Sequence, residues 1–442
     1  MILTRNYKIL NLNNRVILHG SARFLTKKYD PTVKLFGREY PTDEWTNVNK
    51  SIQDKLERKL IHQKYHPLNH LANKIKHFFY KTYINRNGNP LFTIFDNFSP
   101  VVSVEQNFDS LLTPKDHVSR SKKDCFYVNR NYLLRAHTTA HDNELIRSGL
   151  NCFLTFGDVY RRDEIDSKHY PVFHQCDGVR LFDKNELFKD KALEMDIFDK
   201  DEAGIKRTFE KQEYYTLDAS KIVEYDLKNT LTKLVQFIFG NNCKLNMKWV
   251  SATFPFTHPS WELEIEYKGN WYEVLGCGIL EQKILTNAGA ENHIAWAFGL
   301  GLERWAMILY DIPDIRVFWS TDEGFLSQFK YDDPTHSKIT KYKQVSVYPP
   351  CPCDISFWLP DKTDSYEYNS NDFYDLVREV GGDLVEQVTL IDNFENKKTK
   401  KISHCYRIIY RSMERTLSQS EVNELHKKIE AKAKEQIGVQ IR

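Results

Sequence analysis

Residues 346–442 alternate between strand-like and helix-like patterns, and their order limits the possible folds more than any other feature of the chain. Strand-like runs read DISFWL, LVEQVTLID and HCYRIIYRS, followed by a short VQIR. Two helical segments separate them: NDFYDLVREV, closed by two glycines, and a segment that Ser418 and Glu421 begin with the spacing of a capping box. The order βαββαβ predicts a sheet packed against two helices, the ferredoxin-like arrangement.

The rest of the chain predicts a second, larger domain, so that the fold class is α+β. PLNHLANKIKHFFYKTY, from residue 67, has helical spacing, and PLFTIFDNFSPVVS alternates like a strand that stops at Pro100. Strands are expected within 133–182 and again from residue 247, with a hairpin turn at 268–270 and helical segments between. Residues 41–330 are assigned to this domain, and the polar residues 331–345 to a linker.

Composition excludes several classes of protein. The 442 residues suit two or three domains. The 62 Lys and Arg nearly balance the 60 Asp and Glu, so the chain lacks the strong positive net charge that is typical of a nucleic-acid-binding protein. The eight cysteines show neither C-x-x-C spacing nor a cluster with histidines, so a zinc site is not expected. No apolar run approaches the roughly 18 residues that a membrane helix needs.

The first 29 residues contain Arg5, Lys8, Arg15 and further basic residues but no Asp or Glu. This composition is typical of an organellar transit peptide, and residues 1–40 are interpreted as a transit peptide with an N-terminal extension. The alternative is a disordered basic tail of a cytosolic protein.

The stretch FGDVYRRDEIDSKHYPVFHQCDGVRLF, residues 156–182, reads as two strands joined by a polar turn. Period-two alternation sends Phe173, Gln175 and Asp177 to one face, which offers a ring, an amide and a carboxylate. A flat ligand such as adenine can stack on Phe173, while Gln175 and Asp177 suit an ammonium or an amide. Arg161, on the preceding strand, has the bidentate fork that suits phosphate. The alternative is an edge hairpin with a polar face.

A second motif, GLGLERWAMILY, places Gly299 and Gly301 before an apolar helix that carries Arg304 in its first turn. Such glycines let the backbone approach a ligand closely, and an unpaired arginine among apolar residues is costly to bury. The motif therefore predicts a site for an anion. The alternative is a surface arginine paired with Glu303 or Asp311.

Other stretches add candidate residues. Phe254 and Phe256 in FPFTHPS are two residues apart, so they are expected to share a strand face and to offer edge-to-face contacts to a ligand ring. Glu262, Glu264 and Glu273 lie on predicted strands, and one of these carboxylates can hold a Mg²⁺ that bridges phosphates. In LLRAHTTAH, a histidine beside two threonines can hydrogen-bond a carboxylate.

Taken in order, the helix and strand before Pro100, the Arg161 hairpin and GLGLER resemble the three signature motifs of class II aminoacyl-tRNA synthetases. LLRAHTTAH, YPVFHQCDG, FPFTHPS and GLGLERWAMILYDIPDIR resemble phenylalanyl-tRNA synthetases in particular. NDFYDLVREVGGDLVE and SHCYRIIYRSMERTLSQSEV are similar to the anticodon-binding module of the mitochondrial, single-chain form. The resemblance covers approximately residues 60–442 and implies a catalytic domain of antiparallel strands flanked by helices.

The resemblance also implies roles for ligands and residues. The family forms phenylalanyl-adenylate from ATP, with Mg²⁺, and then transfers phenylalanine to tRNA(Phe). Arg161 and Arg304 correspond to the catalytic arginines that bind the ATP phosphates. His169 and Phe173 correspond to further ATP-binding residues, and Glu273 corresponds to the metal ligand. The amino-acid-binding positions are His137, Thr138, Thr139, Gln175, Asp177, Phe254 and Phe256. Asp177 stands where the family more commonly has Glu, which is one methylene longer.

For tRNA, one predicted strand of the C-terminal domain offers two faces. Tyr406 and Tyr410 share one face and Arg407 and Arg411 the other, beside a loop with four lysines. Aromatic rings stack on unpaired bases and cations meet phosphates, so all four residues are predicted to bind the anticodon loop. The alternative places both tyrosines in the core.

The subtype implies a monomeric enzyme of the mitochondrial matrix with no membrane partner. Its pocket can reject tyrosine only by leaving the hydroxyl unpaired, which gives roughly ten- to a hundred-and-fifty-fold discrimination, and no separate editing domain is evident. One rival interpretation is a synthetase paralogue with another acceptor or a regulatory role, which loss of a motif arginine would favour. The other is an RNA-binding protein, which does not require Arg161, Phe173 and Arg304 together.

Overall fold

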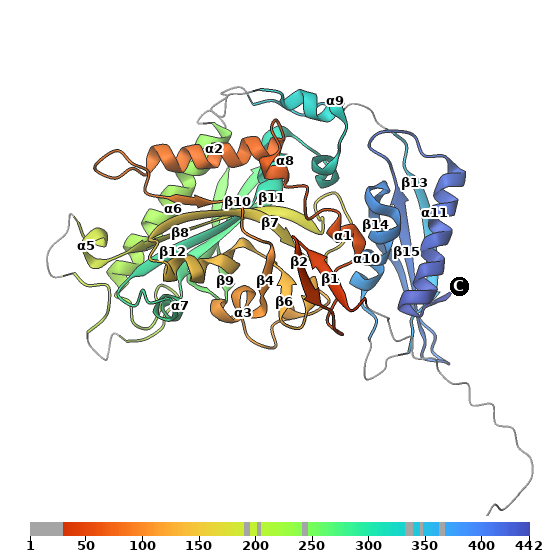
Figure 1. Cartoon of the computed structure of the whole chain (residues 1–442), viewed down its shortest axis with the longest axis horizontal. Coiled ribbons are helices and arrows are strands. Elements are labelled where there is room, and N and C mark those ends of the chain that lie inside the picture. Colours follow the sequence, from red (N-terminus) through yellow and green to blue (C-terminus); the bar gives the residue numbers. More distant parts are fainter. Residues whose placement is uncertain are drawn as a thin grey trace, which may run out of the picture.

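The computed structural model describes residues 30–189, 195–200, 205–240, 246–331, 339–344, 348–361 and 367–442. These residues form a large domain and a smaller C-terminal domain, which lie side by side (Figure 1). Both domains pack mainly antiparallel sheets against helices, so the predicted α+β class is confirmed. The predicted transit peptide lies outside the described residues up to position 29, and residues 32–41, which cross the predicted boundary at residue 40, form a small hairpin.

A seven-stranded sheet organises the large domain, in the order β3-β7-β8-β12-β11-β10-β9. β3 runs parallel to β7, and the other neighbouring strands are antiparallel. Two small sheets, β1-β2 and β4-β6-β5, lie beside it. The strands are β1 Thr32–Leu35, β2 Arg38–Pro41, β3 Thr93–Phe95, β4 Val101–Ser103, β5 Tyr127–Asn129, β6 Tyr132–Leu134, β7 Cys152–Tyr160, β8 Val172–Phe182, β9 Met247–Phe254, β10 Thr257–Tyr267, β11 Asn270–Leu280 and β12 Ile294–Gly301.

Helices cover both faces of this sheet, because successive side chains of a strand point to opposite sides. On β8, Val172 and Cys176 belong to the core shared with α2, α6 and α8, while Val179 and Leu181 pack toward α4 and α7. Figure 1 shows α2 and α8 above the sheet and α7 below it. The α-helices of this domain are α1 Lys50–Gln53, α2 Pro67–Thr82, α3 Val104–Asn107, α4 Asp142–Arg147, α5 Lys184–Leu187, α6 Leu217–Phe239, α7 Gln282–Asn287, α8 Leu302–Tyr310 and α9 Glu323–Leu326.

The predicted strand that stops at Pro100 is shorter than expected. β3 ends at Phe95, because Asp96 is held outside the ladder: its carboxylate binds Lys76 Nζ at 2.6 Å, and its carbonyl oxygen lies 2.8 Å from His62 Nε2. Pro100 instead comes directly before β4. The helix predicted from residue 67 is confirmed as α2, and the hairpin at 268–270 joins β10 to β11.

The described part of the predicted linker is packed against the large domain. Lys341 Nζ donates to Leu309 O at 2.9 Å, and the backbone N–H of Tyr342 donates to Tyr310 O at 2.6 Å. Both carbonyl groups belong to the last turn of α8, whose C=O groups have no partner within the helix. This part of the segment therefore caps α8 as well as leading to the C-terminal domain.

The C-terminal domain has the predicted βαββαβ order, with the strands arranged β14-β15-β13-β16. Ser418 caps the second helix by accepting the backbone N–H of Glu421 at 3.3 Å, while the Glu421 carboxylate binds Arg415. One side of the sheet packs against both helices and contains the core of the domain. Its elements are β13 Cys351–Trp358, α10 Ser370–Gly381, β14 Val385–Glu395, β15 Ile402–Tyr410, α11 Gln419–Lys432 and β16 Gln440–Ile441.

Charged side chains join the two domains. Arg162 follows β7 and binds two carboxylates of α10, with 2.8 Å between its Nη2 and Asp372 Oδ1 and a short contact from its Nε to Asp375. The hydroxyl of Tyr170 donates to Asp383 at 2.7 Å. The loop between β7 and β8 therefore contacts the C-terminal domain directly.

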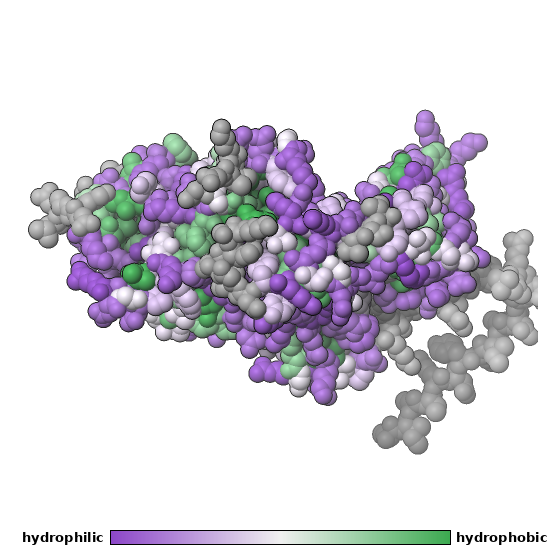
Figure 2. All heavy atoms as spheres, turned by 90° about the horizontal axis from the view of Figure 1, so that it is seen from above, coloured by the Kyte–Doolittle hydropathy of each residue, from purple (hydrophilic) through white to green (hydrophobic). Residues whose placement is uncertain are grey.

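Seen from above, the surface is largely hydrophilic, with scattered hydrophobic patches on both domains (Figure 2). Within the described ranges, each helix is too short or too polar to cross a bilayer.

Candidate active site

The predicted hairpin forms from β7 and β8, and its alternation is confirmed. Phe173 and Gln175 are partly exposed, and Asp177 is 3 % exposed; all three line hollows on one side of the sheet. On the other side, His174 lies in the core and is held by Glu303 of α8, whose Oε1 is 2.7 Å from His174 Nδ1. The backbone N–H of His174 donates to the same carboxylate at 2.8 Å. This pair fixes α8 against β8.

Arg304 lies between two anchored residues of α8. Glu303 binds β8 as described, and Trp305 Nε1 donates to Val274 O at 2.8 Å. Arg304 is exposed, so the argument from a buried charge was wrong. Its partner is Glu273, through a 2.7 Å hydrogen bond to the carbonyl oxygen and a 3.5 Å contact with the carboxylate, and not Glu303 or Asp311.

The larger cavity of this region, about 590 Å³, gathers most of the predicted amino-acid-binding residues. The residues concerned are His137, Thr139, Gln175, Asp177, Phe254 and Phe256. Thr138 is fully buried and does not line it. The rings of Phe254 and Phe256 are nearly parallel, 9° apart, with centroids 5.9 Å apart. Phe256 lies in the turn after β9, so the two rings do not share a strand face, although both reach the cavity.

A second cavity of about 270 Å³ adjoins the first and gathers the predicted nucleotide residues Arg161, His169, Phe173, Glu273 and Arg304. Both cavities are lined by Arg161, Gln175, Glu273 and Gly299, so they share a wall. Arg161 Nε donates to Ala136 O at 2.9 Å, and the guanidinium lies over the Phe173 ring at 5.2 Å. The junction of the two cavities is therefore marked by a fixed arginine.

Burial controls the charges in the larger cavity. Burial, with the nearby Arg161 guanidinium, lowers the pKa of His137 to about 3, so this imidazole is neutral at physiological pH. Burial raises the pKa of Asp177 to about 6, against the opposing effect of hydrogen bonds that include one from Thr139 Oγ1 at 2.5 Å. The cavity thus contains a neutral imidazole and a carboxylate that ionises only above moderately acidic pH.

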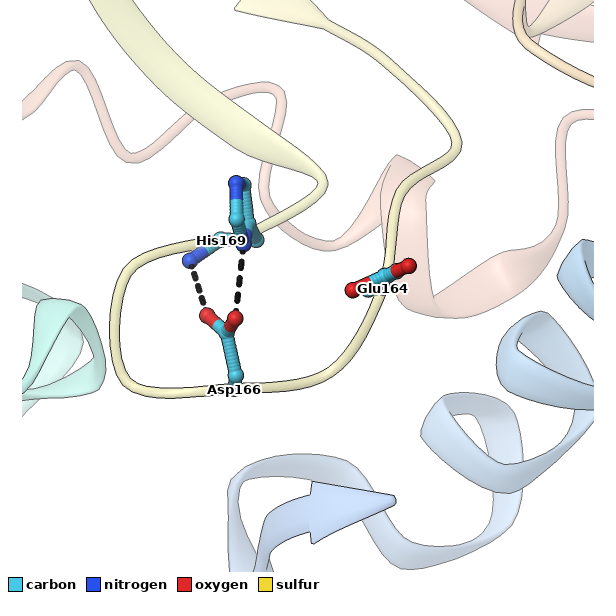
Figure 3. Close-up of side chains that lie close together, drawn as sticks. All are labelled: Glu164, Asp166 and His169. Carbon is cyan, nitrogen blue, oxygen red and sulfur yellow. Dashed lines mark hydrogen bonds and ion pairs between the residues drawn. The ribbon is translucent and has the colours of Figure 1, made fainter. Parts of the chain in front are cut away.

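His169 is held by its own loop, between β7 and β8. Asp166 accepts from the backbone N–H of His169 and contacts His169 Nδ1, both at 2.8 Å (Figure 3). The contact with Asp166 raises the pKa of His169. Glu164 completes the one group of three potential metal ligands found among the described residues, but no dashed line joins it to the other two.

The Glu273 carboxylate suits a Mg²⁺ ion that has few protein ligands, and not an ion that the protein coordinates completely. Its carboxylate is half exposed at the wall shared by the two cavities. Glu262 and Glu264 lie on the neighbouring strand, and burial followed by repulsion from Glu273 and Glu264 raises the pKa of Glu262. Mg²⁺ commonly binds one or two carboxylates together with substrate phosphates, so these residues fit a cation that arrives with ATP.

Sequence reasoning missed Asp142, the first residue of α4. Its side chain is 1 % exposed, lines the larger cavity, and has no hydrogen-bond partner for either oxygen. Its signal in the sequence is weak, because an acidic residue in the first turn of a helix is common.

The predicted tRNA-binding residues of β15 divide by face. Tyr406 and Tyr410 are fully buried in the core, because α10 and α11 cover this face, so neither ring can stack on a base. The alternative interpretation therefore holds for them. Arg407 lies on the other face, where its Nη2 and Nε donate to Asp354 at 2.8 and 2.9 Å. Arg411 follows the end of β15, and its Nε lies 3.2 Å from the Glu386 carboxylate.

Aromatic rings do occur at the uncovered face. Phe394 is 44 % exposed, Trp358 is partly exposed, and their ring centroids lie 6.3 Å apart. The guanidinium of Arg442 lies 5.3 Å from the Trp358 ring and 5.7 Å from the Phe394 ring. This group of two rings and one cation was also missed.

Comparison with known proteins agrees with this architecture. The family described as tRNA synthetases class II core domain (F) matches residues 47–216 and 197–329, and the ferredoxin-fold anticodon binding domain matches residues 346–442. The mitochondrial phenylalanine–tRNA ligase of Mus musculus is 52% identical over 411 residues, which cover 92% of this chain and 88% of that one.

More distant relatives match over nearly their full length. The probable mitochondrial phenylalanine–tRNA ligase of Drosophila melanogaster is 48% identical over 445 residues, 97% of each chain. The mitochondrial phenylalanine–tRNA ligase of Saccharomyces cerevisiae is 39% identical over 473 residues, 96% of this chain and 98% of that one. The chain therefore belongs to the mitochondrial phenylalanine–tRNA ligase family, with a class II synthetase core and a ferredoxin-fold anticodon-binding domain.

Proposed function

We propose that the chain attaches phenylalanine to tRNA(Phe) in two steps, through a phenylalanyl-adenylate made from ATP. The observation that carries this proposal is the pair of adjoining cavities that share Arg161. One has two phenylalanine rings and buried acceptors, which suit an apolar amino acid with an ammonium group. The other has Phe173, Arg304 and Glu273, which suit a base, phosphates and a cation.

The geometry explains how these residues can act. Carboxylate attack on the α-phosphate of ATP places negative charge on its oxygens, and Arg161 stands where the two substrates meet. The contact to Ala136 orients its guanidinium before the reaction, so less reorganisation is needed. Glu273 would hold a Mg²⁺ ion, which would neutralise part of the phosphate charge. The protein therefore acts chiefly by positioning the two substrates.

The assay that tests this proposal is amino-acid-dependent ATP–pyrophosphate exchange on the purified chain, followed by aminoacylation of tRNA(Phe). We expect exchange with phenylalanine, weaker exchange with tyrosine, and none with the other standard amino acids. Silence with every amino acid would refute adenylation, and exchange without aminoacylation would favour a paralogue with another acceptor.

Tyrosine provides a sharper test of the ring-lined cavity. The rings of Phe254 and Phe256 offer the tyrosine hydroxyl no hydrogen-bond partner, so discrimination depends on the desolvation of this hydroxyl. We expect kcat/KM for tyrosine to be roughly ten- to a hundred-and-fifty-fold below that for phenylalanine, with no hydrolysis of tyrosyl-tRNA by the chain itself. Deacylation of added tyrosyl-tRNA would contradict the second part.

The remaining assignments rest on the family. We assign the catalytic domain to residues 41–330, the linker to 331–345 and the anticodon-binding domain to 346–442, which is supported by family matches that end at 329 and begin at 346. Relatives named as mitochondrial enzymes and the acid-free residues 1–29 support action in the mitochondrial matrix. The chain acts as a monomer, and sedimentation at micromolar concentration would reveal a dimer if this is wrong.

A further inference from the structure

Gln212 is a buried amide that the proposed reaction does not use. It lies in the segment before α6, is 2 % exposed, and is outside the described lining of both cavities. Its Nε2 donates to His258 O at 2.8 Å and to Leu280 O at 2.9 Å, and it lies 3.3 Å from Ile279 O. Its Oε1 accepts the backbone N–H of Gln282 at 2.8 Å. One side chain thus joins the start of β10, the end of β11 and the start of α7.

These contacts surround the turn that carries Phe256, between β9 and β10. The carbonyl oxygen of Phe256 accepts the backbone N–H of Glu281 at 3.0 Å, and its ring lines the amino-acid cavity. Gln212 binds the residue two positions after Phe256 and the residues on either side of Glu281. It therefore brackets the backbone contact that joins this turn to the end of β11.

The sheet holds this turn only in part. The pairing of β10 with β11 shifts register between Thr257 and Ser260, and so does its pairing with β9. A buried backbone carbonyl group needs a donor, and a register shift disrupts the regular ladder. Gln212 supplies a donor to the carbonyl oxygen of His258, which lies within the shift. A Cβ at position 278 would lie 2.7 Å from Pro259 O, so the turn packs directly on the backbone of β11.

The segment 208–215 around this glutamine is itself fixed. The backbone N–H of Thr208 donates to Lys211 O at 3.0 Å, which closes a short turn. Lys211 Nζ donates in turn to Tyr215 O at 2.7 Å. The carbonyl oxygen of Thr208 lies 2.6 Å from His258 Nε2, so the segment makes a second contact with the residues that follow the Phe256 turn.

We infer that Gln212 is a positioning residue for substrate selection: it holds the ring of Phe256 at the distance from β11 that fits a phenyl ring. Rejection of tyrosine depends on walls that keep water and hydrogen-bond partners away from its hydroxyl. Without Gln212 the turn can move away from β11, which loosens the contact with phenylalanine and leaves room for a water molecule at the hydroxyl. The inference rests on the proposed function, since it takes phenylalanine as the substrate.

The test compares Gln212→Met with Gln328→Met in ATP–pyrophosphate exchange by the full chain. Methionine keeps the length of the side chain and removes its amide donor and acceptor. Gln328 is the matched control, because its Nε2 also donates to two backbone carbonyl groups, Gly324 O and Lys343 O, both at 2.9 Å. Its Oε1 also accepts a backbone N–H, that of Lys343, at 2.8 Å. It lies outside the described lining of both cavities.

Gln212→Met should raise KM for phenylalanine about tenfold and lower the ratio of kcat/KM for phenylalanine to that for tyrosine by about fivefold or more. KM for ATP should change by less than about twofold, because these contacts do not reach the nucleotide cavity. Gln328→Met should match the parent chain in this ratio. A role confined to stability would lower the melting temperature of Gln212→Met and leave the ratio unchanged, and an unchanged ratio would overturn the inference.

His258→Phe keeps the inference testable if Gln212→Met does not fold. It retains a ring and removes the contact with Thr208, so the phenylalanine-to-tyrosine ratio should fall by about twofold or more. An unchanged ratio in folded His258→Phe would then overturn the inference. If the parent chain shows no exchange with phenylalanine, the proposed function fails and the inference with it. An unchanged ratio beside an active parent chain overturns the inference alone, so the two failures are distinguishable.

Discussion

At the residue scale, two glycines create the space of the amino-acid cavity. A Cβ at position 276 would lie 2.9 Å from the Phe254 ring, and one at position 299 would lie 3.0 Å from the Asp177 carboxylate. Any larger residue there must displace a ligand-facing group. Glycine is therefore needed at position 299 because a side chain would collide with Asp177, whereas a Cβ at position 301 would meet no neighbouring atom.

The role of Arg304 can be tested by a conservative change. Arg304→Lys keeps the charge but loses the planar fork, so we expect KM for ATP to rise about tenfold or more while KM for phenylalanine changes little. ATP–pyrophosphate exchange at varied ATP measures this. Arg130→Lys is the matched control, because Arg130 is also an exposed arginine paired with a glutamate, Glu44, in the same domain. Equal effects of both changes would contradict a nucleotide role.

At the element scale, β15 shows that the exposed face of a strand can be identified only when the neighbouring elements are known. The face with Tyr406 and Tyr410 was distinguished correctly from the face with Arg407, but α10 and α11 cover the tyrosine face. The exposed face is completed by Trp358 of β13 and Phe394 of β14, which no single strand reveals. Candidate base-stacking rings thus come from different strands than expected.

This face gives a prediction for tRNA. Trp358→Ala should raise KM for tRNA(Phe) by about 5- to 150-fold, since base stacking on an aromatic ring contributes about 1–3 kcal/mol. Phenylalanine-dependent exchange should be unchanged, because the large domain forms the adenylate. Tyr225→Ala removes an exposed ring from α6 of the large domain and serves as the control. An unaltered KM for tRNA would exclude Trp358 from the interface.

At the scale of the whole molecule, the domains meet at the loop that follows the active-site arginine. Arg161 faces the cavities, and its neighbour Arg162 binds Asp372 and Asp375 of α10. The side chain of Arg162 is only 7 % exposed, so this contact is largely desolvated. The position of the C-terminal domain and the shape of the β7–β8 loop are therefore linked.

Removing this contact should loosen the domains. Arg162→Ala removes the guanidinium that Asp372 and Asp375 share across the domain contact, which should weaken docking by about 1.5–3 kcal/mol. Limited proteolysis should then cut the 331–345 segment several times faster than in the parent chain. Arg415→Ala, which breaks an exposed pair with Glu421 inside the C-terminal domain, should leave the cutting rate unchanged. Equal rates in Arg162→Ala and the parent would contradict the docking role.

Features that depend on periodicity and on local chemistry could be predicted from the amino-acid sequence. Alternation placed Phe173, Gln175 and Asp177 on one face, and the βαββαβ order defined the C-terminal domain, because both patterns repeat over a few residues. Features that depend on contacts between distant segments became known only from the three-dimensional structure. It placed Asp142 beside Asp177, paired Arg304 with Glu273, and covered Tyr406 and Tyr410. Period-two alternation tells which side chains share a face, but only the packing of helices against the sheet decides which face is buried.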